Sequence, residues 1–493
     1  MHTDRFTPLD AATLLRWMQH DLPNKQLFGI DRELFFMPKP DDPFRMERYG
    51  KVLETPLGVA AGPHTQLAQN ILSAWLCGAR YIELKTVQVL DELNVAKPCI
   101  DMADEGYNCE WSQELKLDQS FEEYLKAFVL LYVLRDMLNL PVEAEPGKGP
   151  GFIFNMSAGY NLEGIKSPAV QRFLDRMENA EEDVKRIKAG LAPLYPAIEK
   201  MPIPARLSDN LTVSTMHGCP PDEVESIGRY FITERKYNTA IKLNPTLLGP
   251  ERLRGILNTQ LGYDVCVPDE AFGHDLKYND GVAIIRNLAA AAETAGVAFG
   301  LKLTNTLETA NEKQNLPRSE GMVYMSGRSL HPISINLAER LQQEFDGKLD
   351  IAFSAGVDTF NVADTLACGL RPITMSSDIL KPGGYGRLHQ YLDTLRAEMR
   401  KAGAHTIAEW EKSRSPIAGN PGFANLVSYA AAVLGKRSRY HKERFPYVSV
   451  KTERPLPRFD CAAAPCMSGC PAEQDIPRYL DAVARGDFEL AWR

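Results

Sequence analysis

The chain has 493 residues, of which 44% are hydrophobic and 24% charged, the balance of a globular protein with room for one large domain and appendages or for two to three domains. Its net charge of −8 argues against binding to a nucleic-acid backbone as a main activity. The longest apolar run, residues 127–134, is too short to span a bilayer, and the N-terminus lacks the apolar core of a signal peptide, so we expect a soluble cytoplasmic protein without a membrane span.

Residues 1–50 form an N-terminal extension in this interpretation, with a short helix over 9–20 and a loop over 38–43. After it, eight short apolar segments rich in β-branched or aromatic residues alternate with helical segments such as 221–235, 281–296 and 385–403. The predicted strands lie near 56–61, 81–87, 152–157, 211–216, 239–244, 298–304, 350–356 and 372–377. Eight repeats, and no G-x-G-x-x-G at a helix start, favour a closed (β/α)8 TIM barrel over residues 51–403 rather than an open doubly wound sheet.

Two connections are too long to be plain loops, residues 88–118 and 262–280. Both follow strands, so we expect both over the carboxyl ends of the barrel strands, where such barrels hold their active sites. Residues 404–455 are predicted to be a helical and loop connection that ends in a linker. Its basic stretch, 436–444, is interpreted as a solvated or docking surface.

Polar and small residues stand at the strand ends in the pattern that a flavin mononucleotide (FMN) site requires. Small residues after the first strand let the backbone approach a flat ring, and a lysine at a later strand end stabilises charge on the reduced ring. Glycine turns after the last strands bind phosphate through backbone N–H groups. The alternative interpretation is that a buried lysine only pairs with a carboxylate such as Glu83.

The order of these segments resembles the dihydroorotate dehydrogenase-like barrel, and more closely the flavin domain of dihydropyrimidine dehydrogenase. The resemblance rests on residues 55–63, 85–87, 211–218, 241–245, 304–306, 325–332 and 353–358. Together with the strand ends it implies FMN and this cofactor-binding set: Ala60, Ala61, Gly62, Lys85, Thr86, Asn155, Lys242, Thr304, Gly327, Ser354, Gly356, Ser376 and Ser377. The predicted substrate-binding residues are Asn108, Ser214, Asn305 and Thr306.

In that family a Cys or Ser on the loop after the fourth strand moves a proton while the flavin moves a hydride. Cys219 is the candidate here, His217 is the alternative, and a pair with no catalytic role is the third possibility. This loop is shorter than in the pyrimidine enzyme, and Thr212 stands where an Asn usually contacts the ring. The resemblance therefore implies a heterocyclic substrate other than simple uracil.

Three of the nine cysteines are clustered near the end of the chain. Cys461, Cys466 and Cys470 precede a proline, a pattern typical of iron–sulfur ligands, with zinc as the alternative. Residues 456–493 resemble the start of the iron–sulfur domain of the glutamate synthase small subunit, although Arg458 stands where that family usually has another Cys. We therefore expect a 4Fe-4S cluster whose remaining ligands lie outside this chain, and a missing module or partner that carries FAD and binds NAD(P)H.

A flavin barrel followed by this segment resembles the layout of a bacterial family named as selenate reductase subunits. The implied function is that of an iron–sulfur flavoprotein oxidoreductase, which moves hydride between NAD(P)H-derived electrons and a C=C or C=N bond of a pyrimidine- or purine-like heterocycle. The alternative is a barrel without a cofactor that docks an electron-transfer module onto a molybdenum-type reductase.

Overall fold

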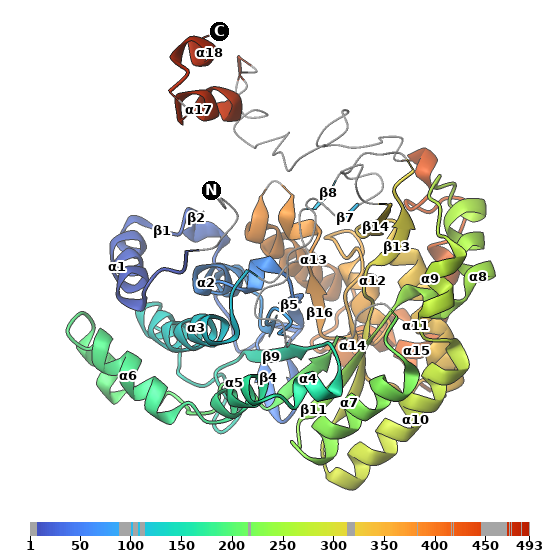
Figure 1. Ribbon diagram of the computed structural model, residues 1–493, viewed down its shortest axis with the longest axis horizontal. Helices are drawn as coiled ribbons and strands as arrows, with labels where there is room; N and C mark the ends of the chain where they lie inside the picture. The colour runs from blue at the N-terminus through green and yellow to red at the C-terminus, as the bar shows by residue number, and fades with distance from the viewer. Residues whose placement is uncertain are drawn as a thin grey trace.

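A computed structural model describes residues 7–87, 100–101, 107–108, 114–214, 218–312, 321–381, 383–415, 417, 419–444, 471–472, 474, 476–484 and 486–492. Eight parallel strands close into a barrel, and each strand pairs with the next barrel strand along the chain (Figure 1). The strands are β5 (Leu57–Val59), β6 (Tyr81–Glu83), β9 (Ile153–Ala158), β10 (Asn210–Val213), β11 (Asn238–Leu243), β12 (Phe299–Leu303), β15 (Ile351–Phe353) and β16 (Ile373–Met375). The prediction of a closed (β/α)8 barrel is confirmed.

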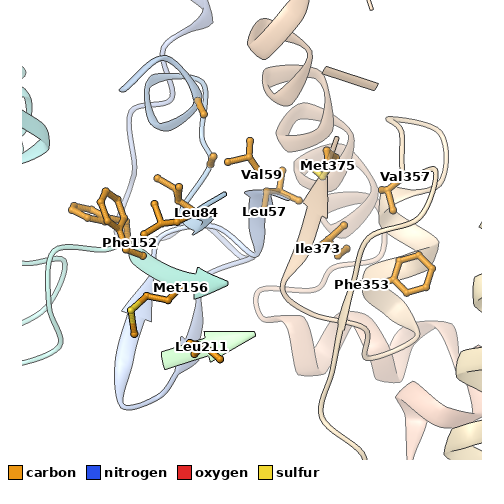
Figure 2. Close-up of a cluster of buried hydrophobic side chains, with 14 of the residues drawn as sticks. Leu57, Val59, Leu84, Phe152, Met156, Leu211, Phe353, Val357, Ile373 and Met375 are labelled. Atoms are coloured by element: carbon orange, nitrogen blue, oxygen red, sulfur yellow. The ribbon is translucent and has the colours of Figure 1, made fainter. Parts of the chain in front are cut away.

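The barrel strands are short and buried on both faces, as their near-continuous apolar sequences predict. Their side chains fill the space between strands and helices, and Figure 2 shows Leu57, Leu84, Met156, Phe353 and Ile373 among those packed there. Burying one such side chain contributes roughly 1.5–3 kcal/mol. This core fixes the strand order and therefore decides which strand ends share one mouth of the barrel.

The helices predicted from periodicity are present. Residues 221–235 form α7 (Pro221–Thr233), which begins with proline at its first position, and 281–296 lie in α10 (Tyr278–Ala295), which ends at Gly296 in a left-handed conformation. The predicted N-terminal helix is α1 (Ala11–Asp21), where the Asp10 carboxylate caps the Thr13 N–H. Residues 385–403 give α13 (Arg387–Lys401).

The remaining helices complete the outer layer or lie beyond it. They are α2 (Ala68–Leu76), α3 (Leu117–Met137), α4 (Leu162–Ile165), α5 (Pro168–Glu178), α6 (Glu181–Leu191), α8 (Pro250–Arg254), α9 (Asp269–His274), α11 (Leu330–Glu344), α12 (Val362–Ala367), α14 (Ile407–Arg414), α15 (Pro421–Ala432), α17 (Ile476–Ala484) and α18 (Phe488–Trp492). Among the described residues, none of these helices is long and apolar enough to cross a membrane.

Two N-terminal hairpins precede the barrel, β1 (Gln26–Leu27) with β2 (Ile30–Asp31) and β3 (Met46–Arg48) with β4 (Lys51–Leu53). The second is bonded to the segment before β9, since the Val52 N–H donates to the Lys148 carbonyl. Just after it, the buried Glu54 carboxylate accepts from Arg80 at 2.6 Å and from Arg135 at 3.0 Å. The sequence indicated neither hairpin.

A small sheet joins the two excursions that leave the carboxyl ends of β6 and β12. It consists of β13 (Leu307–Ala310), β14 (Met322–Met325), β7 (Ile100–Asp101) and β8 (Tyr107–Asn108), in that order. The last two lie inside the long connection predicted to cover this end of the barrel. Residues 262–280 contribute α9, whose His274 ring lies 3.0 Å from the Glu308 carboxylate of β13.

Candidate functional site

A buried ion pair crosses the barrel interior at its carboxyl end. Glu83 ends β6, and its carboxylate accepts from the Ala61 N–H at 3.2 Å on one oxygen and from the Lys302 ammonium on the other. Lys302, on β12, also donates to the Thr374 hydroxyl on β16. All three side chains are buried. Glu83 therefore fixes the turn after β5 and balances the charge of Lys302.

Lys242, on β11, lies in the same region as this pair. Within the described part of the chain, its ammonium forms no hydrogen bond or ion pair, and the side chain is half-buried. Burial lowers the Lys242 pKa to about 8, with smaller effects of Lys302 and Lys85 in the same direction and of Glu83 in the opposite one. Lys302 is paired with Glu83, and the positive charges of Lys302 and Lys85 both act on Lys242.

This geometry answers the question of lysine pairing that the sequence left open. Glu83 pairs with Lys302, which lies inside the predicted strand 298–304, and not with Lys85 or Lys242. Lys85 is half-buried, and the Tyr124 hydroxyl donates to its carbonyl at 3.2 Å. The signal for Lys302 was one charged residue inside an apolar strand, which requires a buried counter-charge.

Polar groups at the ends of β6, β9 and β10 lie beside one another. The Asn155 amide donates to the Thr212 hydroxyl at 2.8 Å, and its own oxygen is buried with no hydrogen-bond partner in the described part of the chain. The Thr86 and Ser157 hydroxyls lie 2.8 Å apart. A Cβ on Gly159 would come within 2.2 Å of the Ser214 carbonyl, so these strand ends are in close contact. The orphaned Asn155 oxygen can accept from a ligand N–H.

The end of β12 places two of the predicted substrate residues. Asn305 is half-buried, and its amide donates to the Asn244 side-chain oxygen, which follows β11, at 2.7 Å. Thr306 is half-buried just before β13. The Thr304 hydroxyl instead lies 2.8 Å from the Ser334 hydroxyl of α11, so it serves the packing of the strand against that helix.

The loops after β14, β15 and β16 meet in a second cluster. Gly356 has φ +54°, and a Cβ there would lie 2.2 Å from the Gly327 carbonyl, so two glycine backbones touch. The Ser326 and Ser377 hydroxyls are 2.6 Å apart, and the Ser354 N–H donates to the Leu303 carbonyl at 2.6 Å. Ser376 is half-buried in the same turn.

Cationic side chains and two carboxylates lie around these glycine loops. Asp358 pairs with Arg439 at 2.7 Å, and Asp378 pairs with Arg387 at 2.9 Å and Lys381 at 3.1 Å. Burial alone would lower the pKa of the Arg387 guanidinium. The nearby Asp378 and Asp358 carboxylates outweigh this effect and raise the pKa. Arg328, the residue after Gly327, lies beside the same loops, so four cationic side chains stand near the glycine turns, and such groups bind phosphate monoesters.

Cys219 lies immediately before α7, half-buried, next to Gly218, whose N–H donates to Asp275 at 3.2 Å. Burial, together with Glu223 and Asp222, raises the thiol pKa to about 11. The thiol is therefore protonated at neutral pH, as a proton donor must be. Among the described residues, no hydrogen bond links Cys219 to the Glu83–Lys302 pair.

Several predicted residues cannot be placed with the others. His217, Cys461, Cys466 and Cys470 lie outside the described residues, and so does the side chain of Asn108. The other predicted cofactor and substrate residues form three groups. The group around Glu83 contains Ala60, Ala61, Gly62, Lys85 and Lys242. The neighbouring strand ends hold Thr86, Asn155 and Ser214, and the glycine loops hold Gly327, Ser354, Gly356, Ser376 and Ser377.

One further residue of the first turn was passed over. His64 stands two residues after Gly62 and is buried, and neither ring nitrogen has a hydrogen-bond partner within the described ranges. Burial lowers its pKa to about 4, against a smaller effect of the Ala60 carbonyl, so the ring is neutral. Its only sequence signal was a histidine directly after a small-residue turn.

A protein-family model and two curated relatives match most of this chain. A family model described as the N-terminal TIM-barrel domain of oxidoreductase YgfK matches residues 28–417. The proposed oxidoreductase YgfK of Escherichia coli strain K12 is 41% identical over 476 residues, and so is its counterpart from strain O157:H7. These matches cover 92% of this chain but only 44% of each relative, so the chain spans less than half of their length.

Solved structures with a similar shape include ligand-free DHODH from Eimeria tenella, with a TM-score of 0.45, 16% identity and coverage of 76% of this chain and 92% of that one. DHODH from the same organism in complex with ferulenol gives a TM-score of 0.44 at 16% identity, covering 82% and 95%. The fold and the family match together define a TIM-barrel domain of the oxidoreductase class. The chain belongs to the YgfK N-terminal TIM-barrel family.

Proposed function

We propose that this domain binds FMN across the carboxyl mouth of the barrel and serves as the substrate-reducing half of an iron–sulfur flavoprotein oxidoreductase. The observation that carries the proposal is the ammonium of Lys242, which has no partner among the described residues and lies beside the Glu83–Lys302 pair. A partly buried cation without a counter-ion is costly, and the negative charge of a bound ligand would offset that cost.

The residues present fit such a cofactor at both ends. Lys242 and Lys85 would face the electron-rich edge of the ring, and the Asn155 oxygen would accept from a ring N–H. The glycine loops at Gly327 and Gly356, with cationic side chains such as Arg387 nearby, would hold the phosphate. When bound, a flavin supplies two-electron hydride chemistry.

In this proposal Cys219 delivers the proton that accompanies reduction of a C=C or C=N bond in a planar nitrogen heterocycle, with His217 as the alternative donor. Its raised pKa keeps the thiol protonated until the transfer. Asn305, Ser214, Thr306 and Asn108 would orient the substrate. A heterocycle is preferred to selenate because hydride transfer suits a carbon–carbon or carbon–nitrogen double bond.

The proposal includes an electron path that lies outside the described residues. Cys461, Cys466 and Cys470 would ligate part of a 4Fe-4S cluster, with the other ligands, FAD and NAD(P)H binding on a further module or partner. The same proposal includes the layout of the family named as selenate reductase subunits, in which an iron–sulfur segment follows a flavin barrel.

The test is a titration of the purified chain with FMN between pH 7 and pH 10. Lys242 must carry its proton to stabilise an anionic ring, so the affinity should fall as the pH rises past about 8, where the ligand-free side chain loses that proton. Lys242→Met should weaken binding at pH 7 by at least tenfold and show no such fall. Lys185→Met, which changes an exposed lysine, should behave like the unaltered chain.

Failure to bind either FMN or riboflavin would remove the flavin proposal. It would leave the alternative that the barrel is a docking scaffold for an electron-transfer module.

A further inference from the structure

The segment 429–440, called here the strap, begins in the last turn of α15 and packs on the loops after β14 and β15. It contains Tyr429, Arg439 and Tyr440, and each of these contacts a residue that holds Gly327 or Gly356 in place. The family model ends before this segment, at residue 417.

The first contact is made through a buried imidazole. The His331 ring of α11 lies 2.7 Å from the Ala355 carbonyl through Nδ1 and 3.0 Å from the Tyr429 hydroxyl through Nε2, and it stacks on the Tyr440 ring at 5.2 Å. Burial lowers the His331 pKa to about 4, so the ring is neutral. Nδ1–H then donates to Ala355, and Nε2 accepts from Tyr429.

The second contact runs through one amide group. The Asn361 side-chain nitrogen donates both to the Gly356 carbonyl, at 3.0 Å, and to the Tyr440 hydroxyl, at 2.9 Å. The Asn361 oxygen accepts from the Asp358 N–H at 2.9 Å. Both hydrogens of this buried amide are therefore used, one on the glycine loop and one on the strap.

The third contact combines an ion pair with a hydrogen bond to a backbone carbonyl. Arg439 holds both oxygens of Asp358, at 2.8 and 2.7 Å, in the fork geometry of a guanidinium. Arg328, the residue after Gly327, donates to the Arg439 carbonyl. The strap is thus bonded to both glycine loops at once.

We propose that the strap is a positioning element for the phosphate end of the cofactor site, with Tyr440 and Arg439 as its positioning residues. Gly356 sits in a left-handed conformation against the Gly327 carbonyl, an arrangement that persists only when its surroundings hold it. This inference rests on the proposed function. It adds that the affinity for FMN depends on the strap, whereas the affinity for riboflavin, which lacks the phosphate, does not.

The experiment titrates the full chain with FMN and with riboflavin, following flavin fluorescence. Tyr440→Phe keeps the stacked ring and removes only the hydroxyl, which leaves one buried N–H of Asn361 without a partner. Arg439→Lys keeps the positive charge and removes the fork. Both should weaken FMN binding by about tenfold and leave riboflavin binding within about twofold. Val427→Ala, at a side chain of α15 that is 42% exposed, should change neither.

Equal loss of both affinities, or loss of neither, would overturn the inference. If the unaltered chain binds neither flavin, the proposed function fails, and amide hydrogen exchange of residues 354–361 then decides about the strap. Faster exchange in Tyr440→Phe at unchanged unfolding free energy would uphold the positioning role, and unchanged exchange would reject it.

Discussion

At the scale of single residues, the lysine charges at the centre of the barrel are arranged around one carboxylate, that of Glu83. Among the described residues, Glu83 is the carboxylate whose negative charge acts on both Lys242 and Lys302, and it opposes the lowering of their pKa by burial. Lys302 is almost wholly buried, so it depends on that carboxylate for its charge to be tolerated.

Glu83→Gln should therefore destabilise the chain by about 3–5 kcal/mol, because it leaves the Lys302 ammonium buried without a counter-charge. Urea unfolding at pH 7 measures this change. The matched control is Glu182→Gln, whose carboxylate pairs with Lys185 at 2.9 Å on the exposed surface and should cost no more than about 1 kcal/mol.

The double variant Glu83→Gln, Lys302→Met should recover much of the lost stability, since it removes the unpaired charge as well. If the double variant were as unstable as Glu83→Gln alone, packing and not charge would explain the effect.

At the scale of elements, a side chain added in the glycine loops would destabilise the fold in two ways, by backbone strain and by a clash with the neighbouring loop, and the two effects can be measured separately. Gly356 and Gly296 both have positive φ, +54° and +71°, so an added side chain strains either backbone. Only at Gly356 would the new Cβ also meet a backbone atom, the Gly327 carbonyl oxygen at 2.2 Å, whereas nothing lies within 4 Å at Gly296.

Gly296→Ala should thus cost about 1 kcal/mol of unfolding free energy, the price of the left-handed backbone. Gly356→Ala should cost more than about 3 kcal/mol, because two loops must also move apart. Chemical denaturation of both variants gives the comparison, and similar costs at the two sites would show that the loops can separate freely.

The elements also show what sequence patterns can predict here. All eight barrel strands were found because a strand buried on both faces leaves a short apolar run, but most were predicted too long at the carboxyl end. Residues 81–87 yield a strand that ends at Glu83, since the polar residues after it turn into the mouth of the barrel. Strand pairs of two to four residues, such as β3 with β4, carry no periodicity to detect.

The site was predictable in part for the same reason. Parallel strands put their carboxyl ends at one mouth, so Lys85, Lys242 and Gly356 could be grouped from the order of segments alone. The pairing of Glu83 with Lys302 could not, because it joins residues 219 positions apart across the barrel interior. Nor could the role of Tyr440, whose partners Asn361 and His331 belong to different loops and helices.

At the scale of the whole molecule, the folded unit extends beyond the barrel that the family model covers. The match ends at residue 417, yet α15 packs against α11, and the Asn425 amide donates to the carbonyls of Ala367 and Glu411 at 2.8 Å each. Leu426 and Tyr440 are buried, and the Lys442 N–H donates to the Leu261 carbonyl at 2.8 Å. Residues 419–444 are therefore structural parts of the barrel domain.

Two shortened chains test this boundary. A chain that ends at Arg444 keeps all of these contacts and should melt within about 2 °C of the full chain. A chain that ends at Arg414 loses Leu426 and Tyr440 from the core, at roughly 1.5–3 kcal/mol for each large apolar side chain, together with both Asn425 bonds. At about 2 °C per kcal/mol, its melting temperature should fall by roughly 10 °C. Calorimetry of the three chains measures these shifts in melting temperature. Equal melting temperatures would place the domain boundary before α15. The strap would then be an attached segment that the barrel does not need for stability.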